Sequence, residues 1–330
     1  MKSRPSINAV AERAGVSIAT VSRVVNKSKP VNEPTRRRVE QAIAELGFRT
    51  NAAGRSLAMA QSHLLLVLVP DFSNPFYAQI VQGVESVTRA AGYKLVLADT
   101  TEGDAPQSTA LDALYNRLAD GVINLAHLAD DAALLGELQN LAWVNCSEFL
   151  PDAGLPYVSI DHRQAAIDAV QYLLNRGHRR IGLINADETY RWARSRHEGY
   201  ELAMRRAGLE VTPDLVRVAA STDYEAGAQA AGGLLALVDP PTAVFAVSDT
   251  LAIGAIKAFR RAGRRVPEDI AVVGFDDLPL SAVFEPALTT IGQPMRELGA
   301  TAAEILLARL QGQRPASRTL AHRLVVRDSA

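Results

Sequence analysis

The first fifty residues carry the apolar spacing of three short helices. In each of them, apolar residues recur at intervals of three and four, which places them on one helix face. A residue that can cap a helix precedes each series, and a glycine that permits a chain reversal follows the first and the third. The caps are Ser6, Ser17 and Asn32, and the glycines are Gly15 and Gly47. This pattern predicts a three-helix unit with a tight turn between its first two helices.

From residue 63 onward, short apolar runs alternate with longer amphipathic segments that are rich in alanine. This alternation predicts parallel sheets with helices on both faces. The runs form two groups, which indicates two lobes and a cleft at the carboxyl edges of their strands. We expect strands at 64–69, 94–98, 122–125 and 143–145 in the first lobe, at 157–160, 180–185, 243–246 and 270–274 in the second, and at 324–326. Helices are expected between them, one of them at 195–207.

The composition of the 330-residue chain suits a soluble protein of two or three domains. The longest strongly apolar run, residues 64–69, is far shorter than the roughly 20 residues of a membrane span. Met1 is followed by polar residues without the apolar core of a signal peptide. The single cysteine, Cys146, excludes a disulfide framework and a cysteine-rich zinc site. We therefore expect a cytoplasmic protein.

Charge is distributed unevenly between the two parts of the chain. Residues 1–60 contain eleven Lys or Arg and four Glu, a net charge of +7, whereas the remaining residues carry −8. A basic segment on an acidic body is typical of a protein whose small part meets a polyanion. A solvated basic face without a partner is the alternative.

The sequence of the second predicted helix adds a resemblance to a known family. Residues 9–26, Ala-Val-Ala-Glu-Arg-Ala-Gly-Val-Ser-Ile-Ala-Thr-Val-Ser-Arg-Val-Val-Asn, resemble the helix-turn-helix headpiece of the LacI/GalR family of bacterial repressors. The resemblance implies that residues 17–26 form a recognition helix in the major groove of DNA. An ordinary three-helix bundle is the alternative.

The resemblance also implies a role for individual residues of this helix. Ile18, Ala19 and Arg23 occupy the base-reading positions of the family. Ile18 and Ala19 can contact a thymine methyl group, and Arg23 can pair bidentately with guanine. Phosphate contacts, which fix the register on DNA, are expected from Ser17, Thr20, Ser22 and Asn26.

Residues 51–60 resemble the hinge helix of the family, whose paired copies enter the minor groove. Asn51 can cap this short helix, Leu57 corresponds to the apolar wedge between base steps, and Arg55 supplies a nearby positive charge. Gly54 departs from the alanine usual in the family and weakens the helix. A flexible linker is the alternative. The expected domains are a headpiece at 1–50, the hinge at 51–60, and an effector-binding and dimerisation domain at 61–330.

The resemblance extends over the rest of the chain, which is also similar to periplasmic sugar-binding proteins. It is carried by segments 70–77, 176–182, 244–249, 273–277 and 288–294. The implied fold is a two-lobed α/β domain with Rossmann-like parallel sheets. The implied effector-binding residues are Asn74, Phe76, Tyr77, Tyr190, Trp192, Arg196, Thr222, Ser248, Asp276 and Gln293.

Several of these residues have a structural alternative. Arg196 and Asp276 could clamp adjacent ligand hydroxyls, or could pair with each other or with neighbours in a structural network. Phe76 could be a core residue, and Tyr190 and Trp192 could be lid residues. Thr222 and Ser248 depart from an aromatic residue and an asparagine that are common in relatives.

Motifs of catalysis are absent from the sequence. Neither a glycine-rich phosphate loop nor the H-E-x-x-H or G-x-S-x-G motif occurs, and the six histidines are scattered. We therefore expect no enzyme activity, no metal and no cofactor. The competing classes are a sugar receptor that does not bind DNA, and a sugar- or nucleoside-processing enzyme.

The predicted function is that of a homodimeric, sequence-specific transcriptional regulator, a repressor, on a near-palindromic DNA operator. A small molecule in the cleft is expected to control it. Segments 145–149 and 155–162 resemble family members that respond to a nucleoside, which favours a nucleoside or ribose-type effector over a different sugar. Whether the effector releases or recruits DNA stays open at this point.

Overall fold

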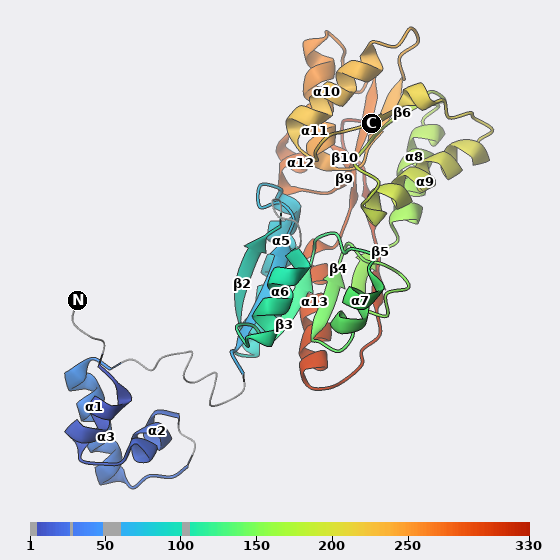
Figure 1. The fold of residues 1–330 in the computed structure, drawn as a ribbon. Helices are drawn as coiled ribbons and strands as arrows, with labels where there is room; N and C mark the ends of the chain where they lie inside the picture. The colour runs from blue at the N-terminus through green and yellow to red at the C-terminus, as the bar shows by residue number, and fades with distance from the viewer. Residues whose placement is uncertain (1–4, 27–28, 49–60, 101–105) are drawn as a thin grey trace. The chain divides into compact units, whose positions relative to one another are not determined.

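The computed structural model describes residues 5–26, 29–48, 61–100 and 106–330. They form two compact units, a small N-terminal unit and a large unit that begins at Leu64 (Figure 1). The residues singled out for the hinge, Asn51, Gly54, Arg55 and Leu57, lie outside the described residues. Each of the two units has its own hydrophobic core.

The small unit, the headpiece, contains the three predicted helices. They are α1 (Ile7–Ala14), α2 (Ile18–Asn26) and α3 (Glu33–Leu46). Ser6 and Asn32 each accept a hydrogen bond from the backbone amide three residues further along, as predicted for helix caps. Gly15 and Gly47 adopt the left-handed conformation, with φ of 65° and 63°, directly after α1 and α3. The local signals of the sequence therefore define this unit.

One valine from each helix forms the centre of the headpiece. Val10, Val21 and Val39 are fully buried, and alanines of α1 and α3 pack around them. Each such side chain contributes about 1.5–3 kcal/mol by leaving water. The ion pair between Arg13 and Glu45, at 2.6 Å, is exposed and contributes less than about 1 kcal/mol. The apolar core thus holds the orientation of α2.

The large unit, the body, consists of two lobes. The N-lobe contains a sheet of six parallel strands in the order β11-β5-β4-β3-β1-β2. Its strands are β1 (Leu64–Val69), β2 (Lys94–Asp99), β3 (Gly121–Asn124), β4 (Trp143–Cys146), β5 (Tyr157–Ile160) and β11 (Arg318–Leu320). Its helices are α5 (Pro75–Ala90), α6 (Pro106–Tyr115), α7 (Ala132–Leu138) and α13 (Met295–Leu310). The prediction that residues 157–160 open the second lobe is wrong, because β5 pairs with β4.

The C-lobe contains a second sheet in the order β12-β10-β9-β8-β6-β7. Its strands are β6 (Ile181–Asn185), β7 (Val216–Val218), β8 (Ala243–Ala246), β9 (Ala271–Asp276), β10 (Thr289–Gly292) and β12 (Arg323–Val325). Its helices are α8 (His162–Asn175), α9 (Arg191–Arg206), α10 (Tyr224–Leu235), α11 (Asp249–Arg261), α12 (Pro279–Val283) and the 3₁₀ turn η1 (Pro213–Leu215). The predicted parallel sheets are confirmed, with one antiparallel pair, β12 and β10.

The chain crosses between the lobes three times. It passes from β5 to α8, from β10 to α13, and from β11 to β12. In Figure 1, α13 accordingly lies in the lower lobe although β9 and β10 lie in the upper one. Both lobes are therefore built from segments that are distant in the sequence.

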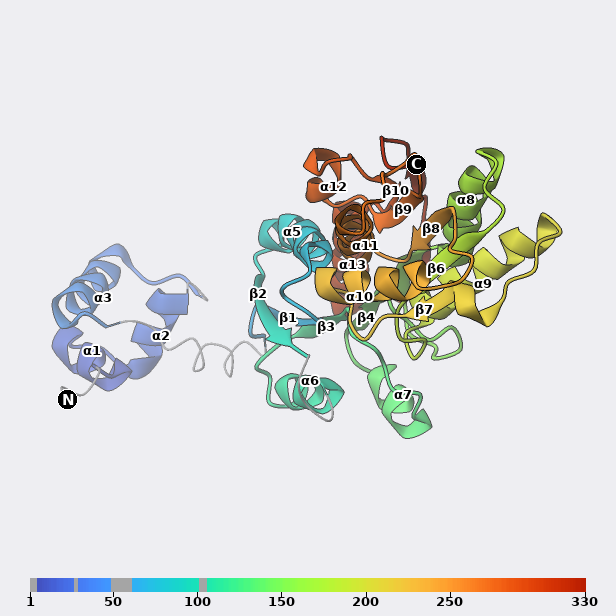
Figure 2. The same ribbon diagram turned by 90° about the horizontal axis from the view of Figure 1, so that it is seen from above.

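The second crossing is secured by a close helix contact in the N-lobe. Helices α5 and α13 lie side by side in Figures 1 and 2. A Cβ atom on Gly83 would lie 2.0 Å from the carbonyl oxygen of Arg296, and one on Gly299 would lie 1.9 Å from that of Ile80. Only glycine permits the two backbones to approach so closely.

Candidate nucleic-acid interface and ligand cleft

Helix α2 presents the predicted base-reading residues to solvent. Ile18 is 50% exposed, Ala19 and Arg23 are exposed as well, and Val21 on the opposite face is buried. Arg23 forms no ion pair among the described residues, in contrast to Arg13. A guanidinium on an exposed helix face can reach the edge of a guanine.

The residues predicted to hold phosphates are distributed along the same helix, from its cap Ser17 to its last residue Asn26. The Ser17 Oγ accepts a hydrogen bond from the Thr20 amide at 3.2 Å, and the two hydroxyl groups lie 2.9 Å apart. Ser17 therefore caps α2, as the sequence predicts. Ser22 is partly buried. Asn26 is the last residue of α2, and its side chain lies outside the described part of the chain.

The cleft of the body lies at the carboxyl edges of the two sheets. It is lined by Asn74, Phe76, Tyr77, Leu125, Ser147, Glu148, Trp192, Arg196, Thr222, Ser248 and Asp276. Eight of the ten predicted effector-binding residues are in this set, whereas Tyr190 and Gln293 are not. The space left between the side chains is about 30 Å³, the share of one water molecule, whereas small-molecule sites measure roughly 300–1,000 Å³.

Arg196 extends from α9 into the cleft and is only 3% exposed. Its Nη1 donates a hydrogen bond to the Val247 carbonyl, and its guanidinium lies 3.5 Å from the centre of the Phe275 ring and 4.7 Å from that of Trp192. Burial lowers the pKa of Arg196 to about 10, so the group remains charged at neutral pH. The cleft therefore holds a fixed cation between aromatic rings.

His162 supports this guanidinium from the side. The Arg196 Nη2 lies 3.2 Å from the His162 Nδ1, and the Ser159 Oγ lies 3.3 Å from the Nε2. Burial and the Arg196 cation hold the pKa of His162 well below its ordinary value. The ring is therefore neutral, with Nδ1 as the acceptor and Nε2–H as the donor to Ser159.

Asp276 ends strand β9 and is 4% exposed. Its Oδ1 accepts a hydrogen bond from the Gln293 Nε2 at 2.7 Å, so Gln293 orients the carboxyl group without lining the cleft. Asp276 and Arg196 form no direct ion pair; each has bonds to its own neighbours. Burial raises the pKa of Asp276 to about 8, which the Arg196 cation only partly opposes.

Two further carboxyl groups near the cleft are absent from the sequence-based set. The first is Asp249, fully buried at the start of α11. It accepts hydrogen bonds from the Leu278 amide at 2.8 Å, the Ser281 Oγ at 2.6 Å and the Thr290 Oγ1 at 2.5 Å. These bonds hold the loop that follows Asp276. Burial raises the pKa of Asp249 to about 6. Its position directly after the predicted strand at 243–246 is the signal that could have identified it.

The second is Glu148, which connects the lobes. Its Oε1 accepts a hydrogen bond from the Arg191 amide at 2.9 Å, and its Oε2 lies 3.4 Å from the Trp192 amide. These amides belong to the first turn of α9, where a carboxylate is stabilised by the helix dipole. Burial nevertheless raises the pKa of Glu148 to about 7. The helix expected near 195–207 is present and begins four residues earlier, at Arg191, so that Glu148 of the other lobe meets its first turn.

The aromatic residues of the cleft differ in their burial. Phe76 is 7% exposed, belongs to the core and also lines the cleft. Its ring meets the Tyr77 ring edge to face at 5.2 Å. Tyr190 lies beside the cleft, with its ring 5.8 Å from that of Trp192 and 5.9 Å from that of His127.

The polar residues at the rim have local roles too. The Asn74 Oδ1 accepts a hydrogen bond from the Phe76 amide at the start of α5. Ser248 caps α11 through the Leu251 amide at 3.2 Å. The backbone carbonyl of Thr222 accepts a hydrogen bond from Thr250. The polar residues at the rim of the cleft therefore lie at or next to the N-termini of helices from both lobes.

No group of His, Cys, Asp and Glu among the described residues has the spacing of a metal site. The thiol of Cys146 is buried in the N-lobe core, which raises its pKa to about 12. Within the described part of the chain, no helix is long and apolar enough to cross a membrane.

Comparison with known proteins identifies both units. Residues 6–51 match the family model of bacterial regulatory proteins, lacI family, and residues 170–330 match that of a periplasmic binding protein-like domain. The HTH-type transcriptional repressor CytR of Escherichia coli K12 is 39% identical over 97% of this chain and 94% of its own length. The ribose operon repressor of the same strain is 36% identical over 91% and 92%. The lac repressor dimer bound to operator has a TM-score of 0.88 at 29% identity, over 99% of both chains.

These two units and these similarities define a transcriptional regulator with a DNA-binding helix-turn-helix domain and an effector-binding domain. The chain belongs to the LacI family of bacterial regulatory proteins. The resemblance of segments 145–149 and 155–162 to the cytidine repressor agrees with the identity to CytR.

Proposed function

We propose that this regulator is a homodimeric repressor in which a neutral, hydroxyl-rich small molecule controls operator binding. The proposed domains are the headpiece at 1–50, the hinge at 51–60 and the effector-binding and dimerisation domain at 61–330. Ile18, Ala19 and Arg23 read base edges, while Ser17, Thr20, Ser22 and Asn26 hold phosphates. In the hinge, Asn51, Gly54, Arg55 and Leu57 form the minor-groove element.

The charged residues of the cleft are the basis for the proposed class of effector. One buried guanidinium, Arg196, faces two buried carboxyl groups, Asp276 and Glu148. Hydroxyl groups of a ligand can exchange hydrogen bonds with these carboxyl groups in either protonation state and can accept from the guanidinium. An anionic group would have only the single buried cation Arg196 as a counter-charge. Phe76 and Trp192 offer rings against which a sugar or a base can pack. A nucleoside or a ribose-type sugar fits this chemistry, as does a different sugar, which is the alternative.

The narrow cleft implies a motion between the lobes. Since the space of about 30 Å³ is too small for a sugar ring, the lobes must part for a ligand to enter. Separation breaks the hydrogen bonds that the first-turn amides of α9 donate to Glu148, and a ligand that re-forms or replaces them biases the lobe angle. A coupling of about 1–3 kcal/mol between cleft and headpiece changes operator affinity 5- to 150-fold.

Exposed apolar residues support a dimer. Strand β2 is the edge of the N-lobe sheet, and its Val96 and Leu97 are 44% and 43% exposed. In the C-lobe, Leu280 and Val283 of α12 are exposed as well. An unpaired edge strand with apolar side chains is a surface that proteins cover. A second copy of the chain is the occupant we propose, and light scattering on the full chain tests it.

The family relationship supports two further proposals. We propose that the chain does not catalyse a reaction, since its CytR and ribose operon relatives are repressors. We also propose a cytoplasmic location, because an operator-binding regulator must reach the bacterial chromosome.

The decisive experiment combines ligand titration with DNA selection. Calorimetric titration with nucleosides, ribose and hexoses tests the effector class, and Asp276→Asn provides the control for the cleft. Heat from hexoses alone would overturn the nucleoside or ribose proposal. Selection of bound sequences from random DNA, with and without the effector, gives the operator and shows whether the effector releases or recruits DNA.

A further inference from the structure

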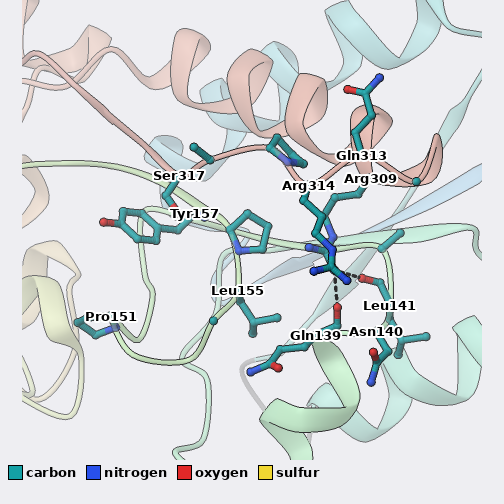
Figure 3. A pocket seen from close by; sticks show the side chains of 16 residues that line it. Gln139, Asn140, Leu141, Pro151, Leu155, Tyr157, Arg309, Gln313, Arg314 and Ser317 are labelled. Carbon is teal, nitrogen blue, oxygen red and sulfur yellow. Dashed lines mark hydrogen bonds between the residues drawn. The ribbon is translucent and has the colours of Figure 1, made fainter.

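A second cavity, of about 620 Å³, lies in the N-lobe away from the cleft (Figure 3). Three connections enclose it, and they precede β4, β5 and β11: residues 139–142, 151–157 and 309–317. These three strands are neighbours and run parallel. The cavity is therefore at the amino edge of the sheet, whereas the cleft is at the carboxyl edge. Its volume is within the range of roughly 300–1,000 Å³ that small-molecule sites occupy.

Two guanidinium groups define one end of this cavity. The Arg309 Nη2 donates to the carbonyl oxygens of Gln139 at 2.8 Å and Leu141 at 2.5 Å, which fixes its position (dashed lines in Figure 3). Arg314 lies beside it, and its charge adds to the effect of burial in lowering the pKa of Arg309. Neither group forms an ion pair with a carboxylate of the described residues, and no lining residue is acidic. Two neighbouring cations without a counter-charge favour an anion.

The other end of the cavity has a different character. In Figure 3, the Tyr157 ring and Pro151 lie apart from the two guanidinium groups, with Leu155 between these ends. The Tyr157 ring is held by stacking on Phe149 at a centroid distance of 3.7 Å. A ligand that fits both ends has one anionic group and one ring or apolar part.

We propose that this cavity binds a phosphorylated metabolite, a phosphate monoester of a nucleoside or a sugar, with its phosphate on Arg309 and Arg314. Arginine suits this role because its planar guanidinium binds two phosphate oxygens at once. The site differs from the cleft in charge, since the cleft holds buried carboxyl groups. The protein thus has a neutral-ligand site and an anion site on opposite edges of one sheet.

The position of the site gives it a regulatory role. Strand β1 begins at the same amino edge, two strands away from β4, which corresponds to about 10 Å. Residues 61–63 precede β1 and connect it to the N-terminal part of the chain. A ligand that joins the three loops stiffens the edge from which the DNA-binding segment departs.

The test uses the full chain and three phosphorylated probes: adenosine 5′-monophosphate, ribose 5-phosphate and inorganic phosphate. Adenosine and ribose serve as the unphosphorylated counterparts. Calorimetric titration is expected to give heat with the phosphorylated compounds, with an affinity that falls as salt rises. Arg314→Gln is expected to weaken this binding about tenfold or more. Arg318→Gln is the matched control, because Arg318 is exposed, belongs to β11 and pairs with Glu304 outside the cavity.

A cleft variant separates this inference from the proposed effector site. Asp276→Asn is expected to change the response to nucleosides or sugars and to leave phosphate-dependent binding intact. In Asp276→Asn, where binding in the cleft is weakened, equal binding of phosphorylated and unphosphorylated compounds would overturn the proposal. The absence of binding by the phosphorylated compounds, or an affinity for them that Arg314→Gln leaves unchanged, would overturn it too. A loss of operator affinity in Arg314→Gln without any added phosphate compound would assign the cavity to the DNA backbone and overturn it as well.

Discussion

The side chains that the recognition helix offers to DNA are exposed to solvent, whereas those that the cleft offers to an effector are buried. Helix α2 displays Ile18 and Arg23 to solvent, on a headpiece core of a few small apolar side chains. The cleft holds Arg196 and Asp276 at 3% and 4% exposure, fixed by hydrogen bonds and aromatic rings. Both regions use an arginine, but only Arg196 is desolvated in the folded protein, whereas Arg23 is hydrated.

This difference determines how each region responds to change. An exposed arginine stays hydrated until it binds DNA. Its contribution to the free energy of operator binding therefore depends on salt and on the one base pair that it contacts. A buried arginine was desolvated when the protein folded, so its removal leaves the buried Val247 carbonyl and His162 without their donor. We therefore expect larger effects from substitutions in the cleft than from those on α2.

The largest effect is expected from Arg196→Met. Methionine keeps much of the length of the side chain but removes the cation, and effector affinity should fall by about 2–5 kcal/mol. Operator binding without effector should persist. Calorimetry measures the effector affinity, and an operator-binding assay measures operator binding. Arg205→Met, an exposed position on the same helix that pairs with Glu201, is the control. Effector affinity equal to that of the parent would show that the guanidinium does not contact the ligand.

A smaller effect is expected from Arg23→Ala. The loss of one bidentate contact should weaken binding to the correct operator by about 1–3 kcal/mol and relax one base position. Binding to a panel of half-site variants measures both. Arg37→Ala on α3, where Arg37 pairs with Glu33, is the matched control. Unchanged discrimination between half-sites would remove Arg23 from the base-reading residues.

The pH dependence of stability should also distinguish the two regions. Burial raises the pKa of Asp249 to about 6, of Glu148 to about 7 and of Asp276 to about 8. The folded body therefore binds more protons than the unfolded chain above about pH 4, and this stabilisation is lost as pH rises through 6 to 8. We expect the melting temperature of the body to fall by roughly 2–8 °C over that interval, or about 1–2 kcal/mol.

Calorimetric scans at several pH values test this expectation, with Asp276→Asn as the variant. Asparagine removes the titrating group, so the fall should become shallower at its alkaline end. A melting temperature of the body that rises from pH 6 to 8 would contradict the assignment of these carboxyl groups.

The smallest effect is expected from Ser17→Ala. The substitution removes the cap of α2 and should cost about 1 kcal/mol of headpiece stability. Circular dichroism of the full chain during heating measures it, and effector titration should not change. A similar loss of effector binding would mean that the two regions are not energetically separate.

The sequence predicted the headpiece almost completely because its signals are local. Caps at Ser6 and Asn32 and glycines at 15 and 47 act on the residues next to them, and the structure places each at a helix end. In the body, the long strands were predicted well, but β7 and β11 have only three residues each and lack a pattern. The direction of β12 could not be predicted, since it depends on a crossing from the other lobe.

The cleft shows a similar limit. Arg196 and Asp276 were found through a family resemblance, and the structure brings them to one cavity. Glu148 and Asp249 were missed because their partners are distant in the sequence: Glu148 binds amides 43 and 44 residues away, and Asp249 binds groups 29 to 41 residues away. The Glu148 contacts need both lobes and the Asp249 contacts need the folded C-lobe, so no local pattern indicates them.

The three crossings also constrain how the body can be synthesised. Helix α13 and strand β11 complete the N-lobe, yet they follow every helix of the C-lobe in the chain. During translation, the C-lobe strands β6 to β10 leave the ribosome before the N-lobe has its last helix and strand. A nonsense mutation directly after residue 292 would therefore damage both lobes at once, by removing α13 and β11 from one and β12 from the other.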